Sequence, residues 1–510
     1  MTAGDKNAEE KRRRFEGNIR AIEEELAMST GTCESERFPS VRIPSGSLAF
    51  ALGLALSLST ASIAAVGPLG ETRERDLLAR VLSPDEGVRG TARAGIVRSG
   101  DRTMLPALVD ALFFASTDAR RDVVLCLEAL SGVRLGANYR YWFEWIGGHE
   151  DLRPPFWYRR FKASLFSRID PAFARFLDPD LPMTIRPEEI LWGGVKKDGI
   201  PALRDPPTIP APEAGYLDPS ETVFGITLRG ASRAYPQRIL DWHEMANDRL
   251  GGEPLALSYC TLCGAAIAYA TSRADGPPYI FGSSGLLYRS NKLMYDEATL
   301  SLWSNLTGEP VAGALVGRAI KLPILPLTVT TWGDWRARHP DTTVLSLKTG
   351  FSRDYTPGAA YGKYFASPET MFPVWKRDPT LEGKSLVFAV RLAGAAKAYP
   401  LDFLFRERVV NDTVGPENVV LIADPETGAA RAYRRLGRRF AEGPKGLLVE
   451  PSTGAFWEYR EEALVPRPGE GEEAPLARVP GHRAFWFGWY AFFPETSVYS
   501  GCGSGGAGER

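Results

Sequence analysis

The chain has 510 residues, of which 44% are hydrophobic and 24% are charged. These are the proportions of an ordinary globular protein, and the length leaves room for about two to four domains. The 61 basic and 62 acidic residues give a formal net charge of −1, so the chain has no overall positive field that would attract an acidic polymer. We therefore expect no nucleic-acid partner.

The first part of the chain predicts export. Residues 1–45 are polar, carry the basic run Lys11–Arg14 and lack apolar periodicity, so we expect them to be disordered. Residues 46–67 contain the uncharged stretch Leu48–Val66, which we interpret as either a transmembrane anchor or a signal peptide. The basic residues before it place the N-terminus inside, which predicts an extracytoplasmic protein, periplasmic or at the cell surface, that is membrane-anchored or secreted.

Residues 70–135 carry apolar residues at helical spacing. The best segments are Met104–Phe114 and Asp118–Leu130, and Leu77–Ile96 is a looser version of the same pattern. They predict HEAT-like helical hairpins, which could present a surface to a protein partner. Residues 136–220 are rich first in Trp, Tyr and Arg and then in Pro, and we interpret them as a packing segment and a Pro-rich linker.

The rest of the chain contains an internal repeat. A shift of 164 residues places Phe224–Tyr269 on Phe388–Tyr433 without a gap, and 18 of the 46 positions are identical. A second stretch follows at a shift of 154 residues and aligns three tryptophans of each copy: Trp303 with Trp457, Trp332 with Trp486, and Trp335 with Trp489. Rare residues at fixed spacing predict a duplicated domain, with a first copy at 221–350 and a second copy at 384–501.

The repeated unit begins with a predicted β-hairpin. Phe224–Leu228 and Ala231–Tyr235 flank a turn at Gly230, and the first of them alternates in polarity. A helix of about three turns would follow, from Pro236 to Asn247, with His243 on one face of it.

Two further strands, Leu255–Cys260 and Ala265–Ala270, would flank a tight turn that ends at Gly264, where we expect a positive φ. The predicted fold class is thus α+β. We expect a strand-rich duplicated domain, its copies packed with approximate two-fold symmetry, preceded by a small α-helical hairpin region.

Cys260, Cys263 and His243 are the candidate soft-metal ligands of the first copy. A Cys-x-x-Cys turn can direct both sulfurs to one ion, and three N/S ligands are typical of an open catalytic zinc site or of a copper site. We therefore predict a metal site of these three residues for zinc or copper. Glu244 and Asp296 are the candidates for a catalytic base or a fourth ligand.

The second copy lacks these ligands. Asp424, Thr427 and Glu407 stand at the positions of Cys260, Cys263 and His243, although the turns, the Asn-Asp pair and the tryptophans are kept. Because all three ligand types are absent together, we interpret them as parts of one site.

Two other interpretations of the cysteines stay open, a thiol/disulfide redox pair and a structural disulfide, since an extracytoplasmic compartment is oxidising. A strand-turn-strand setting differs from the helix N-terminus that lowers a thiol pKa in thioredoxin-like enzymes. The segment Phe281–Asn291 is either a plain loop or the lining of a pocket for a small molecule, with Tyr288 and Asn291 as candidates for contacts to a ligand or cofactor.

The run from Ala234 to Tyr269, then Phe281–Gly313, Arg338–Ser346 and the earlier Asp198–Leu203, resembles the bacterial domain-of-unknown-function family 3179. Its hallmark is a Tyr-Cys-Pro-Leu-Cys-like motif, and this chain departs from it by having Thr261 in place of the proline. The likeness is strong over residues 190–350. It implies an extracytoplasmic protein but no known activity.

The sequence therefore predicts an exported protein of unknown activity with a metal or redox site that acts on a small molecule. The alternative is a non-catalytic binding or assembly protein with a structural disulfide.

Overall fold

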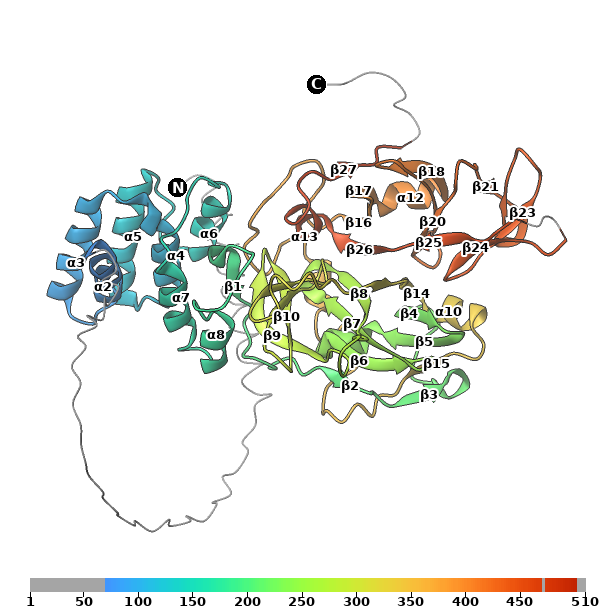
Figure 1. The fold of residues 1–510 in the computed structure, drawn as a ribbon, viewed down its shortest axis with the longest axis horizontal. Helices are drawn as coiled ribbons and strands as arrows, with labels where there is room; N and C mark the ends of the chain where they lie inside the picture. Colours follow the sequence, from blue (N-terminus) through green and yellow to red (C-terminus); the bar gives the residue numbers. More distant parts are fainter. Residues whose placement is uncertain (1–68, 470–472, 502–510) are drawn as a thin grey trace, which may run out of the picture. The chain divides into compact units, whose positions relative to one another are not determined.

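The computed structural model describes residues 69–469 and 473–501. The predictions for residues 1–45 and 46–67 lie outside the described residues. Within the described ranges, no helix is both long enough and apolar enough to cross a bilayer. Figure 1 shows helices in the first part of this region and mostly strands in the rest, so the predicted α+β class is confirmed.

The first part is helical. Its helices are α2 (Leu69–Arg80), α3 (Glu86–Ser99), α4 (Leu105–Phe114), α5 (Thr117–Ser131), α6 (Tyr139–Gly147), α7 (Tyr158–Phe166) and α8 (Pro171–Phe176). Capping residues set the ends: Asp85 accepts a hydrogen bond at the start of α3, Ser116 does so for α5, and Gly132 ends α5 in a left-handed conformation. The helices predicted at 104–114 and 118–130 are confirmed as α4 and α5.

The looser pattern Leu77–Ile96 spans two helices, as a helical hairpin requires. Ser83-Pro84 separates α2 from α3, and Asp85 caps the start of α3. Residues 136–220, expected to be a packing segment and linker, contain α6, α7 and α8. Their aromatic residues, such as Trp142 and Phe161, are buried at helical spacing.

The strands that follow form a first module, defined as residues 222–345. Its elements are β4 (Thr222–Leu228), β5 (Ala231–Pro236), α9 (Gln237–His243), β6 (Met245–Leu250), β7 (Glu253–Cys260), the 3-10 turn η4 (Thr261–Cys263), β8 (Ala265–Ala270), β9 (Phe281–Tyr288), β10 (Asn291–Asp296), β11 (Leu302–Ser304), β12 (Pro310–Ala312), β13 (Ile324–Leu325), β14 (Thr328–Thr331), α10 (Trp332–Arg338) and β15 (Thr343–Leu345).

Three short strands before the module complete its sheets: β1 (Ile190–Trp192), β2 (Leu203–Arg204) and β3 (Thr208–Pro210). The sheet orders are β14-β4-β5-β15-β3, β13-β8-β7-β6-β2 and β1-β9-β10-β11-β12. The predicted hairpin and the predicted strand-turn-strand around the cysteines are confirmed as β4-β5 and β7-η4-β8.

A second module, defined as residues 386–498, follows a connecting segment that holds α11 (Gly362–Ala366). Its elements are β16 (Leu386–Leu392), β17 (Ala395–Pro400), α12 (Leu401–Glu407), β18 (Val409–Val414), β19 (Glu417–Asp424), β20 (Ala429–Arg434), β21 (Ala441–Glu442), β22 (Leu448–Val449), β23 (Phe456–Tyr459), β24 (Ala463–Pro466), β25 (Leu476–Val479), β26 (Gly481–Phe485), α13 (Trp486–Tyr490) and β27 (Ser497–Val498). The sheet orders are β26-β16-β17-β27 and β18-β19-β20-β25-β24-β23-β22-β21.

The two modules share their strand registers. Val223 pairs with Pro236 in the first module and Val387 with Pro400 in the second, and Cys260 with Ala265 corresponds to Asp424 with Ala429. Side-chain clamps recur as well. The amides of Asn247 and Asn411 exchange two hydrogen bonds each with the backbones of Phe281 and Phe440, and Tyr235 and Tyr399 donate to Asp248 and Asp412.

The predicted helix from Pro236 to Asn247 is wrong in its second half. Helix α9 ends at His243, and Asn247 lies in β6. Glu244 takes a left-handed conformation with φ of 53°, which ends the helix and turns the chain into β6. Pairing of β6 with β7 and the Asn247 clamp on Phe281 outweigh the helical pattern here.

A buried ionic cluster joins the modules. Arg431 of β20 binds Glu461 at 2.8 Å, and Arg478 lies 3.4 Å from the same carboxylate. Thr328 of β14, in the first module, donates its hydroxyl proton to Glu461. The contacts between modules are reciprocal, since β14 packs against β20 and β26 packs against β8.

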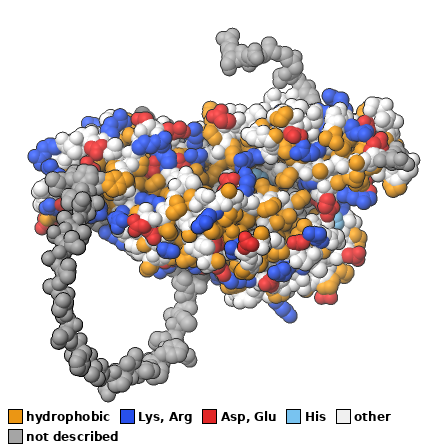
Figure 2. All heavy atoms as spheres, viewed as in Figure 1, with side chains coloured by type: hydrophobic (Ala, Val, Ile, Leu, Met, Phe, Trp, Pro, Cys, Tyr) orange, Lys and Arg blue, Asp and Glu red, His pale blue; other side chains and the backbone are white. Residues whose placement is uncertain are grey.

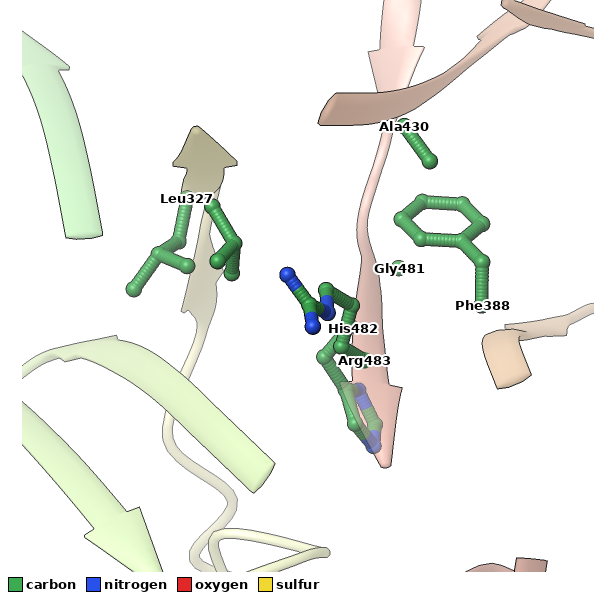
Figure 3. Close-up of a pocket in the computed structure, with 7 residues that line it drawn as sticks. Leu327, Phe388, Ala430, Gly481, His482 and Arg483 are labelled. Carbon is green, nitrogen blue, oxygen red and sulfur yellow. The ribbon is translucent and has the colours of Figure 1, made fainter. Parts of the chain in front are cut away.

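A small cavity lies where these strands meet. It has a volume of about 10 Å³, which is room for a single water molecule. Figure 3 shows the guanidinium of Arg483 reaching from β26 toward Leu327 beside β14. The lining residues are Leu327, Val329, Phe388, Ala430, Gly481, His482 and Arg483. On the surface in view, Figure 2 shows basic and acidic side chains interspersed, so that face carries no field of a single sign.

We expect Glu461→Gln to lower the free energy of unfolding by about 3–5 kcal/mol, because Arg431 and Arg478 would lose their buried counter-charge. Denaturant titration measures this change. Glu458→Gln is the matched control: Glu458 pairs with Arg460 on the surface, and its loss should cost less than about 1 kcal/mol.

The effect of Glu461 should depend on pH. Burial alone raises its pKa, but Arg431, His339 and Arg478 together hold the pKa well below the ordinary value of 4.5. Because its pKa is depressed in the folded state, the Glu461 carboxylate contributes its full stabilisation above pH 4.5, and this stabilisation is lost as the pH falls further. The difference between wild type and Glu461→Gln should therefore shrink below that pH, and a difference that grows on acidification would contradict the assignment.

Candidate functional site

The cysteine pair lies at the turn between β7 and β8. Cys260 is the last residue of β7, Cys263 ends η4, and Gly264 has a φ of 60°, as the sequence predicts. Both residues are free thiols and are buried, with 1% and 0% of their surface exposed. One helical turn thus places the two sulfurs next to each other inside the module.

The two thiols have different surroundings. Burial acts to raise the pKa of Cys260, but hydrogen bonds from Cys263 and from the backbone amides of Lys292 and Cys263 bring it below its ordinary value. Burial and the neighbouring Cys260 raise the pKa of Cys263 instead, and its thiol donates to the carbonyl oxygen of Ser290 at 3.2 Å. The surroundings therefore favour a thiolate at Cys260, while Cys263 is the member of the pair whose thiol donates a hydrogen bond.

Glu244 links the cysteine turn to its neighbours. Its carboxylate accepts a hydrogen bond from Thr261 at 2.8 Å, within the Cys-x-x-Cys turn. Its carbonyl oxygen accepts from the Lys292 ammonium at 2.6 Å, and the Lys292 nitrogen lies 3.8 Å from the carboxylate. Burial raises the pKa of Glu244 and lowers that of Lys292, against the attraction between them. The predicted candidate Glu244 is thus at the site, together with a lysine that the sequence analysis missed.

His243 is also buried, but its ring nitrogens bind other groups. Nδ1 lies 2.8 Å from the carbonyl oxygen of Pro201, and Nε2 lies 2.6 Å from the hydroxyl of Tyr355. Burial lowers the pKa of His243 to about 4, so the imidazole is neutral at pH 7. Among the residues that the structure describes, no three His, Cys, Asp or Glu side chains converge as a metal site would require. The three-ligand metal site stays a prediction.

The other predicted residues divide between the site and its surroundings. Asp296 accepts hydrogen bonds from the indole of Trp303 at 3.0 Å and from Thr299, so its carboxylate holds a turn together. Tyr288 packs edge-to-face on Phe492, with ring centroids 5.0 Å apart, and burial raises its pKa. Asn291 does lie at the site, next to Cys263, whose pKa it lowers.

The connecting segment between the modules covers the thiols. We call residues 351–385 the covering segment. Its Tyr364 donates to the carbonyl oxygen of Leu262 at 2.6 Å, in the middle of the Cys-x-x-Cys turn. Tyr361 lies beside Glu244 and Thr261, and Ser290 donates to the carbonyl oxygen of Pro373. The sequence held no signal for these contacts, because the partners are distant in the chain.

The second module completes the cover. Helix α13 packs so closely on the turn that a Cβ added at Gly488 would lie 2.9 Å from both Cβ and Sγ of Cys263. The ring of Phe485 faces Gly264 in the same way, 3.3 Å from where its Cβ would stand. Gly488 is thus required by the thiol beneath it, and both modules enclose the cysteine pair.

In the corresponding turn of the second module, oxygen-bearing side chains take the positions of the two thiols. Asp424, at the position of Cys260, accepts a hydrogen bond at 2.9 Å from the hydroxyl of Thr427, at the position of Cys263. Arg408, at the position of Glu244, lies 3.8 Å from Asp424. This turn therefore holds an anion at its first position and a hydrogen-bond donor at its second.

The family model described as "Protein of unknown function (DUF3179)" matches residues 197–496, which include nearly all of both modules and the covering segment. No curated protein and no solved structure matches the chain. The match spans more than half of the chain and includes the Cys-x-x-Cys turn with everything that encloses it. The chain belongs to the DUF3179 family of proteins of unknown function.

Proposed function

We propose that the chain is an exported thiol/disulfide redox protein whose Cys260 and Cys263 interconvert between a dithiol and a disulfide. The observation that carries the proposal is the asymmetric pair of free thiols on one turn. Hydrogen bonds stabilise an anion at Cys260, while Cys263 holds the proton. The thiolate is the nucleophilic form of cysteine, so a pair with one acidic member is poised for disulfide chemistry.

The second module supports this assignment of charge. Asp424 and Thr427 occupy the two positions with a carboxylate acceptor and a hydroxyl donor. If the turn favours a negative charge at its first position, Cys260 is the thiolate in the first module. We also propose that the two modules arose by duplication of one unit, because their registers and clamps coincide and their mutual contacts are reciprocal.

Metal binding by His243, Cys260 and Cys263, with zinc or copper, is the second candidate. One observation favours it: the Nδ1 bond to the Pro201 carbonyl is the kind of contact that orients a metal-ligating histidine. The ligating nitrogen Nε2, however, is occupied by Tyr355, and the Lys292 ammonium beside Cys260 disfavours a second cation. We therefore rank the redox pair first.

A structural disulfide is a third possibility, favoured by the burial of both sulfurs. Reduction potential separates it from a redox pair. Structural disulfides have potentials below about −300 mV, whereas redox-active pairs lie between about −270 and −120 mV.

We expect the pair to titrate at about −270 to −180 mV in glutathione buffers equilibrated to completion, with the disulfide between Cys260 and Cys263 identified by peptide mapping. Either Cys260→Ser or Cys263→Ser should abolish the transition, and Cys126→Ser should not change it, because Cys126 is buried in α5 and its pKa is raised to about 12. His243→Ala should leave the potential unchanged. If that variant instead loses a stoichiometric zinc or copper, the metal assignment is correct.

We further expect residues 1–75, fused to a phosphatase that folds only outside the cytoplasm, to give an active enzyme, because the uncharged stretch 48–66 follows basic residues. Deletion of 48–66 should abolish activity. Membrane fractionation then distinguishes an anchor from a cleaved signal, and activity in the deletion variant would refute export through this segment.

A further inference from the structure

Protein groups from the covering segment and from the second module pack over the cysteine pair. Tyr364 of the covering segment holds Leu262, Gly488 of α13 presses on Cys263, and Phe485 faces Gly264. Only 1% and 0% of the surfaces of Cys260 and Cys263 are exposed. A disulfide of another protein must place one of its sulfurs in line with the attacking thiolate. Such a disulfide cannot reach this pair unless the covering segment or α13 moves away.

Unpartnered polar atoms surround the pair. Within the described residues, neither the nitrogen nor the oxygen of the buried Asn291 carboxamide has a hydrogen-bond partner of good geometry, and the side chain lies close enough to Cys263 to lower the pKa of that thiol. Ser258 is fully buried, shares the face of β7 that carries Cys260, and its hydroxyl is also unpartnered. Such atoms destabilise the folded state when they are left without a partner.

The second module shows that the fold does not need these polar atoms. Ser258 corresponds to Ile422, in the same register with its neighbouring strand, and the half-unsatisfied Asp241 of α9 corresponds to Phe405 of α12. The module without the thiols has apolar residues where the module with the thiols keeps unpaired polar ones. At the positions of Ser258 and Asp241, the first module therefore keeps polar groups that the shared fold does not require.

We infer that the substrate of the cysteine pair is a small, uncharged hydroperoxide, held by the carboxamide of Asn291 as it reacts. The inference rests on the proposed redox function and names its oxidant. A hydroperoxide both donates and accepts hydrogen bonds through its O–OH group, which matches the amide nitrogen and the carbonyl oxygen that Asn291 presents beside Cys263. Its small size and lack of charge suit a buried site.

The chemistry balances without another reactant. The Cys260 thiolate attacks one peroxide oxygen, the O–O bond breaks, and the leaving oxygen takes up a proton to form an alcohol, or water when the peroxide is hydrogen peroxide. Cys260 is then a sulfenic acid. Cys263 attacks that sulfur, the S–S bond forms, the S–O bond breaks, and a water molecule leaves with the proton of Cys263. The two sulfurs have supplied the two electrons that reduce the peroxide.

The first experiment compares two oxidants on the reduced, folded full-length chain. Hydrogen peroxide should form the Cys260–Cys263 disulfide at least about tenfold faster than it oxidises free cysteine at the same pH, with one peroxide consumed per disulfide. The bulky disulfide 5,5′-dithiobis(2-nitrobenzoate) should label neither cysteine until the protein is unfolded. A peroxide rate no higher than that of free cysteine would overturn the inference, and so would equally rapid labelling of the folded and unfolded protein.

Asn291→Ala tests the assigned contact. We expect it to slow disulfide formation by peroxide about tenfold, a larger factor than the change in the equilibrium constant of the pair that follows from the lost effect on the Cys263 pKa, because Asn291 would also act on the oxidant. Asn305→Ala is the matched control, since Asn305 is equally buried and neither of its amide atoms has a hydrogen-bond partner in the part of the chain that the structure describes. If the two variants slow the reaction equally, Asn291 has only a structural role and the inference fails at that step.

Gly488→Ala tests the cover. The added methyl group would lie 2.9 Å from Cys263, so we expect α13 to shift and the bulky disulfide to label the folded protein at least about tenfold faster. Gly362→Ala is the control in the covering segment, because nothing lies within 4 Å of the added Cβ. Unchanged labelling of the Gly488→Ala variant, with its folding verified, would show that α13 does not close the site.

These results separate the inference from the function on which it rests. If the pair titrates in glutathione buffer but reacts with peroxide no faster than free cysteine, the redox function stands and the peroxide substrate is excluded. If no oxidant forms the Cys260–Cys263 disulfide in the folded protein, both fail.

Discussion

The left-handed backbone of Glu244 is the constraint on which the site depends. Its N–H closes α9 through Leu240 at 2.7 Å, and its carbonyl oxygen accepts from Tyr259 at 2.8 Å and from Lys292. One residue thereby fixes the end of the helix, the start of β6 and the position of Tyr259, the residue of β7 directly before Cys260. Arg408 repeats the geometry with φ of 59° and bonds of 2.7 and 2.8 Å to Leu404 and from Ala423, although its side chain has the opposite charge. The backbone device is common to both modules, and only the first adds thiol chemistry to it.

The sequence predicts those parts of the fold that depend on local pattern. Alternation in Phe224–Leu228 and the glycine at 264 identify the hairpin and the cysteine turn, since strand period and positive φ are properties of a few neighbouring residues. The end of α9 could not be predicted, because Glu244 adopts a backbone conformation that is unfavourable for its residue type. The pairing of β6 with β7, which involves residues further along the chain, compensates for it.

The site is predicted less completely for the same reason. Spacing alone identifies Cys260 and Cys263, and the adjacent Glu244 proves to be part of their surroundings. His243 also lies next to Glu244 in the sequence, but its ring nitrogens contact Pro201 and Tyr355 and not the cysteines. Tyr355 belongs to the covering segment and is 112 residues away in the chain. Gly488, which touches Cys263 across 225 residues, has no local signal, since its packing depends on how the two modules meet.

The division of labour between the modules follows from where each places its buried polar groups. In the second module, the Glu461 carboxylate pairs with Arg431 and Arg478 and accepts a hydrogen bond from Thr328 of the first module. Within the described residues, the first module leaves the side chains of Asn291 and Ser258 without hydrogen-bond partners of good geometry near its thiols, at a cost in stability that a well-packed partner can offset. The same contacts that hold the modules together also bring α13 over Cys263. Stability and enclosure of the site are therefore one property of the interface, and a variant that loosens the interface should expose the thiols before the whole chain unfolds.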